Sequence, residues 1–227
     1  MSQVSLKFVL SSPIQNIQVR AEKVIEKTLN TKLKKAAKII ETKLPPLLLK
    51  AIKSSHVYYS LIHNVSFTGG SFFGQIGVPD IRNKIDAIIH HWAFNHEPID
   101  VKPFRFVSGR IEGGLRFRAI KADYSDVLSM EEARIIVDSD NGNVILPWLE
   151  WLLVGGNGYI IRDYTYFEDP SITQYSRTGT GIMRSDPGSG WKVPDEFAGT
   201  QENNWLTRIL DITLESVSEE IFKILTK

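Results

Sequence analysis

SPIQNIQVRAEKVIEKTLNTKLKKAAKIIETKLPP, residues 12–46, predicts the longest element of the fold. Its apolar residues recur in steps of three and four, which places them on one face of a helix. These residues are Ile14, Ile17, Ala21, Val24, Ile25, Leu29, Leu33, Ala36, Ala37, Ile40 and Leu44. Ser12 and Pro13 favour a helix start. Pro45-Pro46 predict its end or a kink, because a proline ring cannot donate the helical hydrogen bond.

Downstream of this helix the pattern alternates between short helices and strands. Helical stretches are expected from Leu47 to Ile62 and after Pro79-Asp80, where isoleucines line one side. The centre predicts strands at Val101–Val107, Leu115–Ile120, Ala133–Val137 and Tyr159–Phe167, a turn at Gly113-Gly114 and a short helix at Leu146–Val154.

The last third of the chain combines a glycine-rich segment with a final helix. Residues 168–200 are expected to form a long arm or loop, and an amphipathic helix is expected from Gln201 to Leu225. The elements show no regular βαβ alternation, which predicts an α+β fold. We expect a long N-terminal helix, a central and mainly antiparallel β-sheet, a glycine-rich arm and a C-terminal helix. At this length one domain is expected over residues 1–227: a helical part (1–62), a mixed centre (63–167), the arm (168–200) and the last helix (201–227).

Composition excludes several classes of site. The 227 residues contain no cysteine, which excludes disulfides, thiol nucleophiles and cysteine-ligated metals. The pattern predicts neither a signal peptide nor a membrane span. Net charge is +1, but residues 1–55 hold 11 Lys and Arg against 3 Asp and Glu, whereas the remainder holds 16 against 23. A basic front and an acidic remainder can attract each other within one fold or between subunits.

Candidate catalytic groups are sparse. Asp86 and His90 share a helical face and, with His96, could ligate a metal in a hydrolase, although a polar helix face is the simpler interpretation. A second acidic group could serve acid–base chemistry, although carboxylates beside turns are usually solvated. It consists of Glu131, Glu132, Asp138 and Asp140. Nucleophile and phosphate-loop motifs are lacking, so the sequence predicts no enzyme, cofactor or metal.

The polar face of the first helix is rich in lysine. Lys34, Lys35 and Lys38 could contact DNA or an acidic partner, or could simply be solvated. A nucleic-acid-binding module is therefore one alternative to a purely structural role.

Three segments carry a family resemblance: SRTGTGIMR (176–184), WKVPDEFAGT (191–200) and NNWLTR (203–208). They resemble the C-terminal part of tail-completion or neck proteins of tailed bacteriophages, in which an Arg-Thr-Gly turn precedes a strand, a Gly-Thr turn and a final helix. SFFGQIGVPD (71–80) and PWLEWLL (147–153) are similar to segments of phage virion proteins. The entry to the last helix is polar instead of proline-rich, which leaves adaptor, stopper and terminator roles open.

The resemblance implies assembly without catalysis. It implies a homo-oligomeric ring at the neck or upper tail of the virion, built in the host cytoplasm, with portal, adaptor, terminator or tail-tube proteins as partners and DNA passing through the channel. Arginine and tryptophan are enriched at binding hot spots, so the glycine-rich arm is the expected interface. The expected interface residues are Arg177, Gly179, Arg184, Trp191, Gly199, Asn204 and Trp205.

Overall fold

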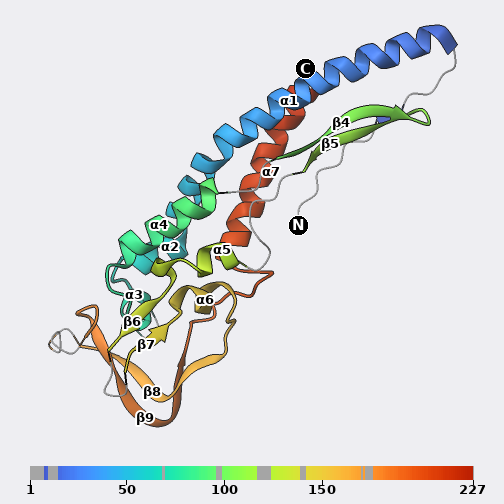
Figure 1. Cartoon of the computed structure of the whole chain (residues 1–227). Helices are drawn as coiled ribbons and strands as arrows, with labels where there is room; N and C mark the ends of the chain where they lie inside the picture. The colour runs from blue at the N-terminus through green and yellow to red at the C-terminus, as the bar shows by residue number, and fades with distance from the viewer. Residues whose placement is uncertain are drawn as a thin grey trace. The chain divides into compact units, whose positions relative to one another are not determined.

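The computed structural model describes residues 8–9, 15–67, 70–95, 99–116, 124–138, 142–169, 171 and 176–226. Its elements in chain order (Figure 1) are β1 (Phe8–Val9), α1 (Gln15–Lys53), α2 (His56–Ile62), β2 (Ser66–Phe67), β3 (Gly70–Ser71), α3 (Phe72–Ile76), α4 (Ile81–Phe94), β4 (Asp100–Val107), β5 (Arg110–Arg116), α5 (Ser125–Leu128), the 3₁₀ turn η1 (Glu131–Ala133), β6 (Ile135–Val137), β7 (Val144–Leu146), α6 (Trp148–Leu153), β8 (Tyr159–Glu168), β9 (Gly181–Lys192) and α7 (Trp205–Thr226). The α+β prediction is confirmed.

The β-structure is distributed over small antiparallel sheets and does not form one central sheet. One sheet has three strands in the order β1-β5-β4, and β2–β3, β6–β7 and β8–β9 are two-stranded. The chain also divides into two compact units. The single domain expected over residues 1–227 stays a prediction. The first unit comprises residues 1–48, 95–120 and 210–227, and the second comprises 49–94 and 121–209.

Helix α1 continues through the proline pair, so of the end or kink predicted there the end is wrong, and the kink stays a prediction. Pro45 and Pro46 cannot donate to the carbonyls of Glu41 and Thr42, but both of these residues are exposed, so water can bond their carbonyl oxygens. Burial on both sides of the prolines holds the helix together. The buried residues there are Ile40, Leu44, Leu48 and Ile52. The predicted start at Ser12-Pro13 lies outside the described residues.

The predicted second helix, Leu47–Ile62, is divided in the structure. Its first part belongs to α1, and α2 begins anew after Ser55, whose side chain accepts a hydrogen bond from the Tyr58 amide. A serine side chain that bonds an unpaired amide in this way is a favourable helix start. The hydroxyl of Ser55 also donates to the carbonyl of Ile52, which ties the end of α1 to the beginning of α2.

The first unit is built on the contact between α1 and the β4–β5 hairpin. Leu33 of α1 packs with Phe104 and Ile111 of the hairpin, and all three are at most 3% exposed. Partly buried residues surround this cluster: Ile25, Leu29, Val101, Phe106 and Leu115. Burial of each large apolar side chain contributes about 1.5–3 kcal/mol, so the cluster is a main source of stability in this unit.

The hairpin turn lies at Ser108-Gly109 and not at the predicted Gly113-Gly114. Gly113 lies inside β5, where an added Cβ would approach the Phe104 Cα to 2.6 Å. The glycine is therefore required by close contact between the strands and not by a turn. Of the predicted strand Leu115–Ile120, residues 117–120 lie outside the described residues.

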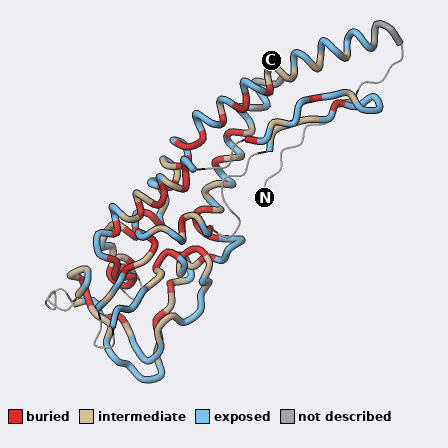
Figure 2. Tube along the Cα trace, in the orientation of Figure 1, coloured by how far each residue is buried: buried red, intermediate tan, exposed pale blue. Residues whose placement is uncertain are grey.

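The second unit has an aromatic core. Its fully buried side chains include Trp148, Trp205, Phe72 and Phe197, and the rings of Phe72 and Phe197 stack with centroids 4.0 Å apart. Figure 2 colours the buried positions of the described residues red. Helix α4 buries the isoleucine stripe predicted for it. The short helix predicted around residues 146–154 is also present, as α6.

Residues 168–200 do not form the predicted arm, because they contain β9. This strand pairs with β8 from Glu168–Gly181 to Tyr159–Lys192. The segment looks like a loop in the sequence because Ser185–Gly190 is made of turn-forming residues. In the structure those residues form a bulge inside the strand.

Candidate functional site

The β8–β9 ribbon presents large aromatic side chains to solvent. Tyr159 is 65% exposed, and Tyr164 and Phe167 are each 42% exposed. Arg162, Asp163 and Tyr164 are consecutive and all exposed, so neither face of the ribbon is covered at that point. Because the sheet has only two strands, each strand also has an outer edge without a ladder partner among the described residues.

A bulge shapes the exposed middle of the ribbon. Arg162 pairs with Gly190 and Tyr164 with Ser185, so the single residue Asp163 faces residues 186–189. Asp163 has a positive φ of 60° and accepts a hydrogen bond from the Gly188 amide at 2.9 Å. Thr165 Oγ1 donates to Asp186 Oδ2 at 2.8 Å. The bulge is therefore ordered by side chains of the ribbon itself.

The end of the ribbon near residues 166–181 is fastened by hydroxyl groups. Tyr166 is 8% exposed, and its hydroxyl shares a hydrogen bond with Thr180 Oγ1 at 3.0 Å. Thr180 Oγ1 also bonds Thr178 Oγ1 at 2.8 Å. Gly74 in α3 leaves room for the tyrosine hydroxyl, because an added Cβ there would collide with it. Burial raises the pKa of Tyr166 above its ordinary value, and the Thr180 hydrogen bond offsets part of this rise.

Arg177 and Gly179 lie at or near the surface, beside the hydrogen-bonded hydroxyl groups of Tyr166 and Thr180, which we call the anchor of the ribbon. The Arg177 guanidinium packs against the backbone of Gly77, which ends α3 in the left-handed conformation. The side chain is exposed overall, and burial of part of it lowers the pKa of Arg177. Gly179 has a φ of +74° with open space around it. Both residues are thus placed where a partner could reach them.

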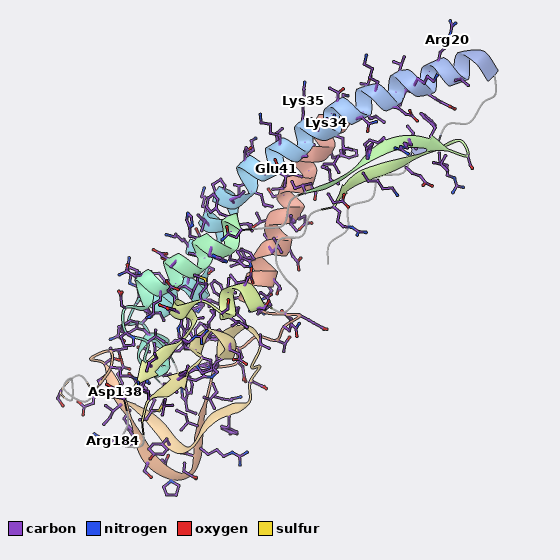
Figure 3. All side chains as sticks on the ribbon, viewed as in Figure 1. Arg20, Lys34, Lys35, Glu41, Asp138 and Arg184 are labelled. Carbon is purple, nitrogen blue, oxygen red and sulfur yellow. The ribbon has the colours of Figure 1, made fainter. Side chains whose placement is uncertain are left out.

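Arg184 extends over the ribbon and stays half exposed. Its guanidinium carbon lies 5.4 Å from the centre of the Phe167 ring, and its Nη2 lies 3.9 Å from Asp169 Oδ2. Hydrogen bonds from Ser171 lower the pKa of Asp169, so the carboxylate stays charged beside the arginine. Figure 3 labels Arg184 at this end of the second unit. Phe167 and Arg184 together form an aromatic–cation pair open to solvent.

Four of the predicted interface residues are buried in their own chain, so their assignment to an interface is corrected. Trp191 is 7% exposed, and its Nε1 donates to Gln75 Oε1 at 3.1 Å. Trp205 is 1% exposed and belongs to the core. Asn204 is fully buried and accepts hydrogen bonds from the Leu206 and Thr207 amides, which caps α7. Gly199 is buried where an added Cβ would meet the Leu152 carbonyl at 2.5 Å.

The sequence could not distinguish these core roles from interface roles, because tryptophan and asparagine serve both. It also missed the exposed aromatics Tyr159, Tyr164 and Phe167. Their strand was predicted, but a strand covered on one face and a strand open on both have similar residue types.

Lys34, Lys35 and Lys38 are exposed on α1, as a contact role requires. Figure 3 labels the first two of them on α1. Among the described residues, none of the three lies within ion-pair distance of a carboxylate. Arg20 and Lys27 lie on the same side of the helix with the same exposure. The cationic face of α1 is therefore not neutralised by the described part of its own chain.

The residues considered for a metal site have other partners. Asp86 accepts a hydrogen bond from the Tyr58 hydroxyl at 2.8 Å and forms an ion pair with Lys53 at 3.1 Å. Burial, followed by this hydrogen bond to Asp86, raises the pKa of Tyr58 to about 12. The His90 ring stacks on Phe94, and His96 lies outside the described residues. Among the described residues no three His, Asp or Glu side chains meet in a metal-binding group.

The acidic residues near the centre are dispersed. Glu131 and Glu132 belong to η1, where the Glu132 carbonyl accepts a hydrogen bond from Trp148 Nε1 at 2.8 Å. Asp138 is exposed after β6, and Asp140 lies outside the described residues. A hollow of about 170 Å³ lies nearby, and its charged lining residues are Arg134 and Glu150. Arg134 Nη2 donates a hydrogen bond to the Ser129 carbonyl at 3.0 Å.

Comparison with models of protein families, with curated proteins and with solved structures finds no match to this chain. In the described part of the chain, no helix has both the length and the apolar character that crossing a bilayer requires. The chemistry of the surfaces is therefore the basis for a functional proposal.

Proposed function

We propose that this chain is a structural protein that assembles with copies of itself into a ring at the neck or upper tail of a tailed bacteriophage. Its role would be head–tail joining or tail completion, with portal, adaptor, terminator or tail-tube proteins as neighbours. The resemblance of residues 176–184, 191–200 and 203–208 to phage neck and tail-completion proteins supports this assignment. In this role the protein acts through contact surfaces and makes or breaks no bond.

The observation that carries the proposal is the exposed surface of the β8–β9 ribbon. Tyr164 and Phe167 are large aromatics left 42% exposed, and Arg184 lies over Phe167. Aromatic residues and arginine are the types enriched in the centre of protein–protein interfaces. A two-stranded ribbon with open edges can also extend its ladder with another chain. These properties suit a subunit that meets copies of itself or other shell proteins.

The test is assembly of the purified chain, measured by light scattering after size exclusion and by negative-stain microscopy. The wild type should form rings, alone or after addition of portal or tail-tube protein. The triple variant Tyr164→Ser, Phe167→Ser, Arg184→Ala should raise the concentration for half-assembly by about tenfold or more, because it removes the exposed anchors. The matched control Arg105→Ala removes an exposed arginine from β4 and should assemble as the wild type does.

Two outcomes would contradict the proposal. One is a wild-type protein that stays monomeric at all concentrations and binds neither portal nor tail-tube protein. The other is reproducible turnover of a small molecule that is lost when a single carboxylate or imidazole is replaced, since that would identify an enzyme.

A nucleic-acid-binding module is the second candidate, and three exposed lysines of α1 that form no ion pair with a described carboxylate favour it. Lys34, Lys35 and Lys38 would neutralise phosphates, so duplex DNA affinity should fall steeply as salt rises. Replacing all three by glutamate should then abolish most of the affinity. Unchanged DNA binding in that variant would rule this role out.

A further inference from the structure

The outward side of α1 is a continuous cationic face. Its members lie opposite the buried residues Leu33, Ile40 and Leu44, and all are exposed. They are Arg20, Lys27, Lys34, Lys35 and Lys38. At 1.5 Å of rise per residue the face extends about 27 Å along the helix.

Like charges are stacked along this face. Lys34 and Lys38 are one helical turn apart, a spacing at which equal charges destabilise a helix by a few tenths of a kcal/mol. Val24 lies on the same face between Arg20 and Lys27 and is 65% exposed. The face therefore combines positive charge that meets no carboxylate among the described residues with an exposed apolar side chain, and a protein partner could satisfy both.

The outward side of α7 has the opposite charge. Asp211, Glu215 and Glu219 are exposed at intervals of four residues, on the side away from the buried Thr213 and Val217. Their run covers about 12 Å of helix, so it fits within the length of the cationic face. Equal charges at this spacing are again locally unfavourable.

An apolar side chain accompanies these carboxylates as well. Ile212 is 70% exposed and lies on the outward side of α7 beside Glu215 and Glu219. The two faces thus have the same composition with opposite charge: each carries an exposed branched aliphatic residue among a row of like charges. Both belong to the first compact unit, yet they lie on different helices, so one copy could present both at once.

We propose that the acidic face of α7 in one copy binds the cationic face of α1 in a second copy. This inference rests on the proposed homo-oligomeric function and names the surfaces that join its subunits. Charge complementarity would set the register, while Val24 and Ile212 supply apolar contact. A DNA backbone would pair with the lysines but offers no counterpart for either aliphatic side chain, which favours the second copy. Because the two faces differ, the contact is heterologous. It closes into a ring when the rotation between neighbouring copies brings the last copy back to the first.

The experiment reverses the charges in matched pairs and measures the concentration for half-assembly. Lys34→Glu with Lys38→Glu should raise it by about tenfold or more, because two glutamates would then face the carboxylates of α7. Glu215→Lys with Glu219→Lys should have an effect of similar size. The fourfold variant that combines all these changes should recover most of the assembly, since opposite charges face each other again. Higher salt should weaken wild-type assembly.

Lys102→Glu with Arg105→Glu is the control, because it reverses two exposed cations on β4 away from the cationic face. It should assemble as the wild type does. Far-ultraviolet circular dichroism of every variant verifies that the helices persist, so that loss of assembly is not loss of fold.

The outcomes separate this inference from the function on which it rests. A ring that survives both charge reversals overturns the α1–α7 contact and leaves the ring function standing. Failure of the fourfold variant to recover assembly likewise overturns the contact. An intact ring in which the lysine reversal removes only binding to duplex DNA assigns the cationic face to nucleic acid. A wild type that never assembles overturns the ring function itself.

Discussion

The two longer hairpins of this chain share an antiparallel topology but are stabilised in different ways. The β4–β5 hairpin in the first unit packs Phe104 and Ile111 against Leu33 of α1, and all three are at most 3% exposed. The β8–β9 ribbon in the second unit leaves Tyr164 and Phe167 42% exposed and carries a bulge in its middle. The first hairpin therefore contributes to a core, whereas the second leaves aromatic side chains, a type enriched at protein interfaces, exposed to solvent.

Polar contacts follow the same division. Asn30 of α1 bonds both backbone groups of Phe104: its Nδ2 donates to the carbonyl at 3.1 Å, and its Oδ1 accepts from the amide at 2.7 Å. In the ribbon, Thr165 and Asp186 bond each other without help from a helix. The comparison fits the general rule that an isolated two-stranded hairpin is only marginally stable in water. It is stabilised either by packing one face on a helix or by hydrogen bonds that hold its ends.

The largest expected effect comes from removing the docked aromatic of the first hairpin. Phe104→Ala should lower the free energy of unfolding by about 3–5 kcal/mol, because it empties a fully buried site. Phe167→Ala, its counterpart on the exposed ribbon, should cost no more than about 1 kcal/mol. Urea unfolding followed by circular dichroism measures both values. Equal costs at the two positions would show that the hairpins do not differ as described.

A smaller effect is expected from breaking the polar clamp on β4. Asn30→Ala should cost about 1–3 kcal/mol, because the amide and carbonyl of the buried Phe104 lose their partner together. The control Asn83→Ala removes an exposed side chain whose hydrogen bonds to described residues go to Asp80, and it should have little effect. The same urea titration tests the pair, and a neutral Asn30→Ala would mean that water replaces the clamp.

Alkaline pH should weaken the anchor of the ribbon and leave the first hairpin unaffected. Burial raises the pKa of Tyr166, so the folded state prefers the protonated phenol. This contribution to stability is fully present below the unfolded pKa of about 10 and is lost as the pH rises through the higher folded value. Between pH 9 and 11 the wild type should lose more unfolding free energy than Tyr166→Phe.

Tyr159→Phe removes the hydroxyl of an exposed tyrosine on the same strand and serves as the matched control for that comparison. Identical pH profiles for the wild type and Tyr166→Phe would refute the anchor role of the phenol.

The smallest effect is expected at the bulge. Thr165→Val removes the hydroxyl that donates to Asp186 but keeps a β-branched shape suited to a strand. Because the site is partly exposed, water can replace the bond, and the cost should be about 0.5 kcal/mol. Amide hydrogen exchange at Gly188, whose amide bonds the neighbouring Asp163, should nevertheless speed up. A cost above about 2 kcal/mol would indicate that the bulge is part of the core.

Sequence patterns predicted the elements with strong periodicity. The helices α1, α4 and α7 and the strand β8 were found because one-sided burial repeats every three to four residues in helices, and because strands are rich in branched and aromatic residues. The apolar stripe predicted on α1 is wrong at Ala21 and Val24, which are exposed. The end predicted at Pro45 was wrong because packing on both sides of the prolines outweighs the lost hydrogen bonds.

Strand β9 was missed for a related reason. Asp186, Pro187 and Gly188 favour a turn locally, and only pairing with β8 accommodates them as a bulge. For the candidate site, three of the predicted interface residues, Arg177, Gly179 and Arg184, lie at or near the surface, and their interface role stays a prediction. The sequence could not determine that Trp191, Gly199, Asn204 and Trp205 are enclosed, because burial depends on which distant segments pack around them.

The two adjacent prolines of α1 give this helix an uneven resistance to melting. Pro45 and Pro46 have no amide proton, so two consecutive backbone hydrogen bonds of the helix are missing between residues 44 and 47. Cooperative propagation of helix from one side to the other is therefore weakest there. Each half of α1 must therefore form its own first turn and be stabilised by the side chains that pack against it. Heat or mechanical load should break the helix at Pro45-Pro46 before the turns on either side unwind.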